Sequence, residues 1–369
     1  IENDPLERHF ELKERAVVGA SMPTLDCVDL TSEIWVQNTQ APIAERTLEA
    51  IRETVARGEQ VMVFLNRRGF AAFLICEECG EVRECRHCSI SLTVHQKQGL
   101  LKCHTCGFQE QMPLQCSKCQ GVKLRPMGAG TESLEEQLPR LLEGIRVLRL
   151  DRDQVTSATR LEQVLDHFRA GDADVLLGTQ MLVKGHDFPQ VTLVVVMLAD
   201  SLFRWPDFRS SERALQVLTQ VAGRAGRGVI AGKVMIQTFS PEHPVVQAVL
   251  QQVDAHAWYE QEKALRRELG YPPFGRLVKF RVEGATREEA SSVARHLFDF
   301  LEKQPEAVGV EILGPTEAMI ERVKDTFRWE IMLKSARIPP LHQLISRVKA
   351  AQAAWQGRLI VDVDPSGVG

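Results

Sequence analysis

The 369-residue sequence has no apolar run long enough to cross a membrane. Its longest such run, VTLVVVMLA at 191–199, has nine residues, whereas a membrane-spanning helix needs roughly twenty. It also lacks an excess of positive charge, since 45 Lys and Arg stand against 49 Asp and Glu. These absences predict no membrane contact and exclude a protein that binds nucleic acid through a generally basic surface. Any phosphate must therefore be bound by locally placed groups.

An export signal is also missing, because the opening residues IENDPLERHF have neither a basic segment nor an apolar core. The first residue is Ile1, which favours a fragment of a longer chain. The composition, 44% hydrophobic and 25% charged, is typical of globular proteins and excludes disordered and fibrous ones. We therefore expect a cytoplasmic protein of two to three domains.

Eight of the nine cysteines form C-x-x-C pairs, all between residues 76 and 119. The pairs are Cys76/Cys79, Cys85/Cys88, Cys103/Cys106 and Cys116/Cys119. In a secreted protein they would suggest disulfides, and a redox motif would need one pair beside a βαβ unit. Four consecutive pairs without an export signal instead predict two structural zinc ions, each bound by four thiolates.

The spacing of the pairs indicates which of them share a metal ion. Sequential pairing would leave tight loops of five and nine residues, with little room for a hairpin. Between Cys88 and Cys103 lie fourteen residues, SISLTVHQKQGLLK, which read as strand, turn and strand. We therefore predict a nested arrangement, in which the two inner pairs bind one zinc and the two outer pairs bind the other.

Strand-length apolar runs alternate with helical patterns over much of the chain. The expected strands are 61–65, 146–150, 174–179, 192–198 and 233–239, and the expected helices are 41–58, 131–144, 158–171 and 211–223. This alternation predicts a wound parallel α/β sheet. Because the cysteine-rich block follows the first of these strands, it is expected to be an insertion.

From about residue 275 a second order of elements begins. Strand, helix, two strands, helix and strand are expected in turn, which is the ferredoxin-like β-α-β-β-α-β unit. Residues 241–275 are expected to form connecting helices that end at Pro272 and Pro273.

Two segments of the α/β region carry polar groups suited to a ligand. GTQMLVKGHDFP (178–189) follows a buried strand, and ligands of open parallel sheets bind outside the carboxyl ends of strands. QVAGRAGRG (220–228) ends a helix with two arginines spaced by glycines, which suits recognition of a phosphate. An ordinary solvated helix end is the alternative for the second segment.

Thr131 is expected to be a helix N-cap. The N–H groups of a helix N-terminus also bind phosphate, and the preceding Gly128 and Gly130 permit close approach. A DNA-backbone contact through Thr131 is therefore the second interpretation of this residue.

These segments carry a family resemblance. GTQMLVKGHDFP and QVAGRAGR resemble motifs V and VI of the second RecA-like lobe of superfamily 2 helicases. VMVFLNRRGFA and GAGTESLEEQL resemble earlier motifs of that lobe, and the cysteine array lies between them. Together with PDFRSSER (206–213) and DVDP (362–365), the array is similar to that of the bacterial primosomal replication-restart helicases.

The resemblance implies a division of the chain into parts. The expected parts are a tail from the first motor lobe (1–28), the second RecA-like lobe (29–75 and 128–240), a zinc-binding insert (76–127), connecting helices (241–275) and a C-terminal ferredoxin-like domain (276–369).

The chain departs from the family in lacking the motifs of the first lobe. No G-x-x-x-x-G-K-[ST] and no D-E-x-H motif occurs in the 369 residues. Because nucleotide binds between two lobes, we expect this chain alone to be inactive, with ATP and Mg²⁺ bound only in the full-length protein.

The resemblance also assigns roles to residues. Arg224 and Arg227 are expected to face the γ-phosphate as arginine fingers, with Gln220 orienting the phosphate. Gly185 and Asp187 are expected to couple nucleotide to DNA. The expected DNA contacts are Thr179, Thr131 and Lys184, although a plain surface role suits Lys184 equally well.

The implied function is ATP-dependent 3′-to-5′ DNA unwinding that restarts stalled replication forks in bacteria. Its implied partners are branched forks, single strands, single-stranded DNA-binding protein and other primosome proteins. Two alternatives are a non-catalytic zinc-ribbon binding module, which has no need of arginine fingers, and another superfamily 2 translocase with a coincidental zinc insert.

Overall fold

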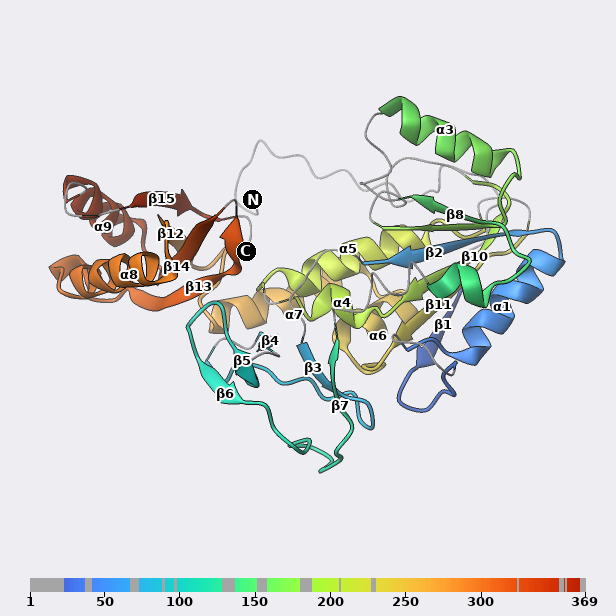
Figure 1. Cartoon of the computed structure of the whole chain (residues 1–369), viewed down its shortest axis with the longest axis horizontal. Helices are drawn as coiled ribbons and strands as arrows, with labels where there is room; N and C mark the ends of the chain where they lie inside the picture. The colour runs from blue at the N-terminus through green and yellow to red at the C-terminus, as the bar shows by residue number, and fades with distance from the viewer. Residues whose placement is uncertain are drawn as a thin grey trace.

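In the computed structural model the described part of the chain forms three sheets (Figure 1). The described residues are 23–36, 42–66, 73–87, 90–95, 98–127, 137–150, 158–179, 188–205, 207–226, 230–323, 325–351, 355 and 357–365. None of the helices formed by these residues is both long enough and apolar enough to cross a membrane.

The largest sheet is six-stranded and wholly parallel, with the order β1-β11-β10-β2-β9-β8. Its strands are β1 (Thr24–Asp29), β2 (Gln60–Leu65), β8 (Val147–Leu150), β9 (Val175–Gly178), β10 (Val191–Met197) and β11 (Lys233–Thr238). Every residue of β2, β9 and β10 is buried, as expected where helices cover both faces of a parallel sheet. The predicted parallel α/β fold is confirmed.

Helices cover the two faces of this α/β lobe. They are α1 (Glu45–Ala56), α3 (Ala158–Arg169), α4 (Asp200–Phe203), α5 (Ser210–Ala222), α6 (Pro244–Leu250) and α7 (Ala255–Glu268). One core joins Phe168 of α3, Leu218 of α5 and Val245 of α6 to one face of the sheet. The other core joins Ile51 of α1 and Leu138 to the opposite face.

The edge strand β1 is a difference from the sequence prediction, which placed residues 1–28 in a tail. Residues Thr24 to Asp29 pair in parallel with β11 along its whole length. Ion pairs of 3.0 Å join Asp26 to Arg46 and to Lys233, and they help to fix this edge. The strand is short and only Val28 in it is fully buried, so its apolar pattern was too weak to identify.

The cysteine-rich module (residues 73–127) forms a five-stranded antiparallel sheet with the order β6-β5-β4-β3-β7. Its strands are β3 (Phe73–Cys76), β4 (Thr93–His95), β5 (Leu100–Lys102), β6 (Gln109–Gln111) and β7 (Leu124–Met127). The predicted hairpin is β4–β5. Because β3 pairs with β7, the two ends of the module lie side by side, as an insertion requires.

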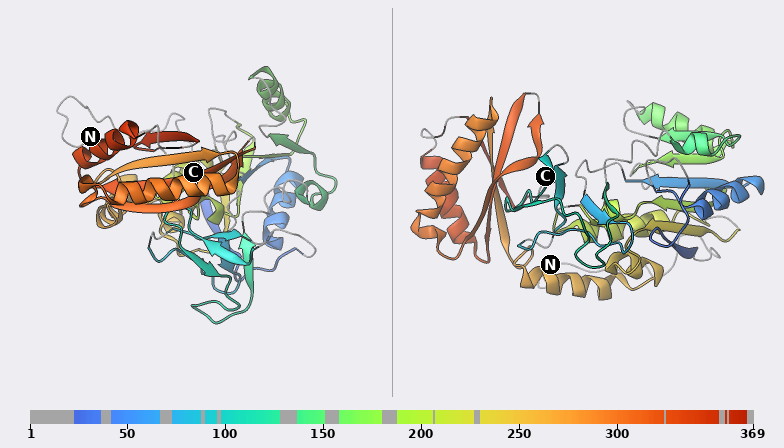
Figure 2. Two further views of the ribbon diagram at one scale, coloured as in Figure 1. Left: turned by 60° about the vertical axis from the view of Figure 1, so that its left-hand side comes forward. Right: turned by 60° about the horizontal axis from the view of Figure 1, so that its bottom comes forward.

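The C-terminal domain follows the predicted β-α-β-β-α-β order. Its elements are β12 (Arg276–Gly284), α8 (Arg287–Glu302), β13 (Glu311–Val323), β14 (Thr326–Ser335), α9 (Ile338–Ala350) and β15 (Arg358–Val363), with a 3₁₀ turn η3 (Pro305–Ala307). The antiparallel order β13-β14-β12-β15 is ferredoxin-like. Both helices cover one face of this sheet, over a core that contains Phe280, Leu297 and Leu344 (Figure 2).

The cysteine-rich module contacts both other parts. Towards the lobe, Gly80 lies so close to the end of β11 that a Cβ there would overlap the carbonyl oxygen of Phe239. Towards the C-terminal domain, Lys102 Nζ lies 2.7 Å from Glu317 Oε2, and both side chains are 10% exposed. His104 Nδ1 lies 2.9 Å from the carbonyl oxygen of Glu317. The module therefore joins the lobe to the C-terminal domain.

Lys102→Met should lower the free energy of unfolding by about 3 kcal/mol, because it leaves the Glu317 carboxylate buried without its main partner. Arg287, 3.2 Å from Glu317, keeps the loss at the lower end of the range for buried pairs. Urea unfolding followed by tryptophan fluorescence measures the change. Lys118→Met is the matched control, because its pair with Glu81 is exposed and 3.7 Å long. Equal effects of the two substitutions would contradict a stabilising contact.

Candidate metal centres and nucleotide-facing edge

The first cysteine of each pair makes the same backbone hydrogen bond. In each, the N–H of the first cysteine donates to the carbonyl five residues later, over 2.7–2.9 Å. The residue after the second cysteine has a positive φ in three pairs, at Gly80 (71°), Gly107 (79°) and Gln120 (62°). Its N–H donates back to the carbonyl of the first cysteine. In the three pairs whose residues are all described, both thiols lie on one side of the turn, where they can share one ion.

The turns bring the cysteines together in the nested arrangement. The thiol sulfurs of Cys76, Cys79, Cys116 and Cys119 lie within 4.8 Å of one another, and so do those of Cys85, Cys103 and Cys106. Cys88 lies outside the described residues. Among the described residues, no cluster of possible metal ligands contains both Cys79 and Cys85, although sequential pairing would require one.

The sulfur–sulfur distances fit a tetrahedral zinc site. Cys76–Cys119, Cys79–Cys116 and Cys85–Cys106 are each 3.6 Å apart. A tetrahedron with Zn–S bonds of ~2.3 Å has edges of about 3.8 Å. A disulfide would need about 2.05 Å, and these cysteines are free. The geometry suits structural zinc.

Backbone N–H groups point at the outer thiols. Those of Lys118 and Gly121 lie 3.4 Å from the sulfurs of Cys116 and Cys119 respectively. Burial opposes ionisation of Cys116, but hydrogen bonds from the backbone of Cys119 and Lys118 outweigh it and lower its pKa to about 7. Burial raises the pKa of Cys79 to about 12. Zinc must therefore displace protons from this cluster, so its affinity should rise with pH.

The helix end that carries the predicted arginine fingers lies at one edge of the parallel sheet. Gln220 is exposed on the last turn of α5, and Arg224 is buried just beyond it. The N–H of Gly226 donates to the carbonyl of Val191 at the start of β10. A Cβ on Gly226 would overlap the backbone nitrogen of Gly232, so only glycine fits this contact. The turn is thus fixed against the amino ends of β10 and β11.

Thr179 lies at the opposite edge, directly after the carboxyl end of β9. The turn that contains Arg224 and Gly226 therefore does not share an edge of the sheet with Thr179. A helix that connects two parallel strands runs antiparallel to them, so its C-terminus reaches their amino ends. The lobe presents one candidate segment at each edge of its sheet.

Six predicted site residues lie outside the described part of the chain: Cys88, Thr131, Lys184, Gly185, Asp187 and Arg227. Phe188, which follows Asp187, is buried, and its ring centroid lies 5.2 Å from that of Phe168 on α3. This contact holds the chain at the start of β10, near the turn that contains Gly226.

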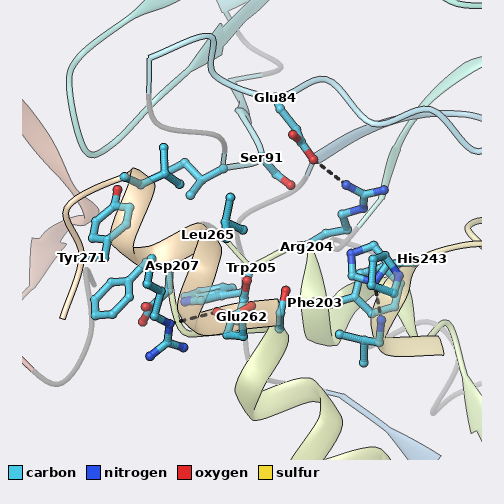
Figure 3. A pocket seen from close by; sticks show the side chains of 18 of the residues that line it. Glu84, Ser91, Phe203, Arg204, Trp205, Asp207, His243, Glu262, Leu265 and Tyr271 are labelled. Carbon is cyan, nitrogen blue, oxygen red and sulfur yellow. Dashed lines mark hydrogen bonds and ion pairs between the residues drawn. The ribbon is translucent and has the colours of Figure 1, made fainter. Parts of the chain in front are cut away.

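The structure adds a cleft that sequence reasoning did not identify, beside the PDFRSSER segment (Figure 3). Asp207 is 1% exposed there and accepts hydrogen bonds from the backbone N–H of Arg209 and from the guanidinium of Arg213. It thereby fixes the start of α5. The unusual PDFRSSER sequence was the available signal, but which elements pack around it is set by tertiary structure.

Three family profiles match the chain. Residues 267–366 match the primosomal protein N C-terminal domain, 85–111 the PriA DNA helicase Cys-rich region domain, and 122–229 the helicase conserved C-terminal domain. The matches cover the C-terminal domain, the inner cysteine pairs and much of the α/β lobe.

Curated relatives match almost the whole chain. It is 40% identical to the replication restart protein PriA of Bacillus subtilis over 327 residues, 89% of this chain and 40% of that protein. It is 38% identical to that of Haemophilus influenzae over 360 residues, 97% of this chain and 48% of that protein. The chain thus spans about half the length of these relatives.

Solved structures give weaker overall similarity. The Pyrococcus furiosus Hef helicase domain aligns with a TM-score of 0.27 at 19% identity, over 53% of this chain and 25% of that one. Saccharomyces cerevisiae Dbp5 bound to RNA aligns with a TM-score of 0.29 at 16% identity, over 67% of this chain and 44% of that one.

Proposed function

Because the chain belongs to the replication restart protein PriA family, we propose that it forms part of an ATP-dependent 3′-to-5′ DNA helicase. In this role it supplies the second motor lobe, the zinc-binding insert and the C-terminal domain. The enzyme would remodel stalled forks and restart replication through primosome assembly, in the bacterial cytoplasm. The observation that carries the proposal is the order of the three parts, since the cysteine-rich module interrupts a helicase-type lobe that leads into the matched C-terminal domain.

ATP with Mg²⁺ would bind against the amino edge of the lobe. Arg224 and Arg227 stabilise charge on the γ-phosphate there, while Gln220 helps to orient it. Gly185 and Asp187, which lie outside the described residues, would couple the nucleotide to DNA. The buried position of Arg224 supports this, because hydrogen bonds made away from water are stronger. The phosphate-cradling loop has to come from another lobe, so the 369 residues alone should not hydrolyse ATP.

Single-stranded DNA would cross the opposite, carboxyl edge, where Thr179 contacts its backbone. Lys184 and Thr131 are the further proposed contacts to the backbone, and both lie outside the described residues. The buried strands of the sheet connect the two edges rigidly. A movement of the lobe during hydrolysis is therefore transmitted to the strand without deforming the sheet. This arrangement favours a motor over the alternative, a non-catalytic zinc-ribbon binding module, because a binding module needs no arginine-bearing turn at a second edge.

The cysteines would hold two structural zinc ions, one in each nested set, with Cys88 completing the inner set. The module supports the fold and offers its surface to partners, namely branched forks, single-stranded DNA-binding protein and other primosome proteins. Four-thiolate zinc sites are closed and contribute folding energy, so no catalytic role is assigned to them.

Thr179→Ala should weaken binding of single-stranded DNA about fivefold, the effect of losing one hydrogen bond. Because threonine is neutral, the dependence of affinity on salt should stay shallow and unchanged. Fluorescence anisotropy with a labelled oligonucleotide measures both quantities. Thr219→Ala, at an exposed position on α5, is the control. Unchanged affinity of Thr179→Ala would remove this residue from the DNA path.

A further inference from the structure

A cleft of about 330 Å³ lies where three parts of the chain meet (Figure 3). The cysteine-rich module contributes Glu84 and Ser91 to its wall, and α7 contributes Leu265. The segment from the end of α4 to the first turn of α5 adds Asp207 and Ser211. The cleft therefore exists only while the module is docked on the lobe.

The charged side chains of this cleft are already paired. Arg204 lies 2.6 Å from Glu84, Arg266 lies 2.9 Å from Glu262 and 2.7 Å from Glu212, and Asp207 lies 2.8 Å from Arg213. Burial lowers the pKa of His243 to about 3, so this side chain is neutral at pH 7. The cleft thus offers no open charge for a phosphate, a carboxylate or an ammonium group.

Its neutral polar side chains, in contrast, are unused. Those of Ser91, Ser210, Ser211, Gln261 and Trp205 form no hydrogen bond with the described part of the chain. Ser91 is only 5% exposed, so its hydroxyl has few alternatives to a ligand in the cleft.

The cleft also has an apolar part to its wall. Phe208 and Tyr271 stack on each other with an interplanar angle of 2° and ring centroids 4.8 Å apart, so these two rings brace the wall and do not offer open faces. The apolar groups left for a ligand are the indole of Trp205 and Leu265, which is 50% exposed. Neutral donors and acceptors beside these groups suit an uncharged planar ligand, which is the chemistry of a nucleobase.

The position fits as well, because the cleft begins at the carboxyl edge of the parallel sheet. The part of its wall formed by α4 and α5 follows β10 in the chain. Asn66, at the end of β2, donates a hydrogen bond from its side chain to the carbonyl of Ser201, and this bond joins the ends of β2 and β10. Thr179 directly follows β9, which is two strand spacings from β10, or about 10 Å. A single strand that passes Thr179 can therefore continue towards the cleft.

We propose that this cleft binds one base of the single strand, turned out of the path of its backbone, with the phosphates remaining outside. The proposal rests on the proposed DNA-binding function and adds a contact to the base itself. It also gives the docked cysteine-rich module a direct part in holding DNA, through Ser91.

The test uses the zinc-loaded chain and forked DNA, because the fork junction fixes the register of the single-stranded arm. Abasic sites are placed at successive positions of that arm. One position should weaken binding about tenfold, since stacking of a single base contributes within this range. The slope of affinity against salt should not change, because no phosphate contact is lost.

A filling variant gives an independent test. Ser211→Phe should weaken binding of intact forks about tenfold. This variant should also bind the fork with the sensitive abasic position as tightly as it binds the intact fork. Gln216→Phe, exposed on the same helix but outside the cleft, should behave as the unchanged protein does.

The outcomes separate the two proposals. Fork binding that is equal at every abasic position overturns the base site alone. Normal DNA binding by Ser211→Phe also overturns it and would direct the search to a protein partner for this cleft. Absence of any fork binding by the zinc-loaded chain overturns the DNA-binding function together with the base site.

Discussion

Arg227→Ala should lower kcat of ATP hydrolysis roughly a thousandfold in a protein that joins this chain to a lobe with a phosphate-cradling loop. The guanidinium compensates charge that develops on the γ-phosphate in the transition state, and alanine cannot replace it. DNA affinity should persist, because the arginine-bearing turn and Thr179 lie at opposite edges of the sheet. Steady-state hydrolysis and anisotropy, measured on the same preparation, give both quantities.

Arg160→Ala is the matched control for this experiment. Arg160 is an exposed arginine of the same lobe, on α3, and its guanidinium lies 3.4 Å from the side-chain oxygen of Gln163. The substitution should leave kcat unchanged, because α3 carries none of the residues assigned to the nucleotide. A near-normal kcat for Arg227→Ala would remove the finger assignment.

Removing one thiol from each nested set should abolish zinc binding altogether. Each structural zinc contributes on the order of 10 kcal/mol to folding of such modules. The double variant Cys79→Ser/Cys85→Ser damages both nested sets and should contain no zinc. Cys79→Ser/Cys116→Ser damages one set and should retain one ion per chain, and Cys27→Ser should retain two. Metal analysis of the purified proteins measures these ratios.

Sequential pairing predicts the reverse result for the two double variants. Cys79 and Cys85 would then share one site, so their loss would spare the other ion. Cys79 and Cys116 would belong to different sites, so their loss would remove both. Because the two arrangements predict opposite results, the zinc content of the two double variants decides which cysteines share an ion.

The parts of the fold that depend on local pattern could be predicted from sequence. Strands such as β2 and β10 are buried on both sides and therefore read as continuous apolar runs. The nested cysteine arrangement followed from the length of one hairpin. In contrast, β1 is an edge strand stabilised by Asp26 ion pairs that involve residues far along the chain, so local pattern could not reveal it.

The candidate site was predictable only in its residue types. Glycine-spaced arginines indicate a turn suited to a phosphate, but the edge of the sheet at which this turn lies follows from the direction of α5, which only the assembled lobe fixes. The cleft near Asp207 depends on docking of Glu84, Ser91 and Leu265 from distant segments. Such contacts leave no periodic signal in the sequence.

We propose that this chain supplies one half of an ATP site whose other half lies on another lobe. The decisive experiment is DNA-stimulated ATP hydrolysis, measured for the 369 residues alone and for a protein in which they follow a lobe with a phosphate-cradling loop. We expect no turnover by the chain alone and DNA-dependent turnover that requires Arg227 in the joined protein. Arg227-dependent hydrolysis by the chain alone, or a joined protein that binds DNA but hydrolyses no ATP, would contradict it.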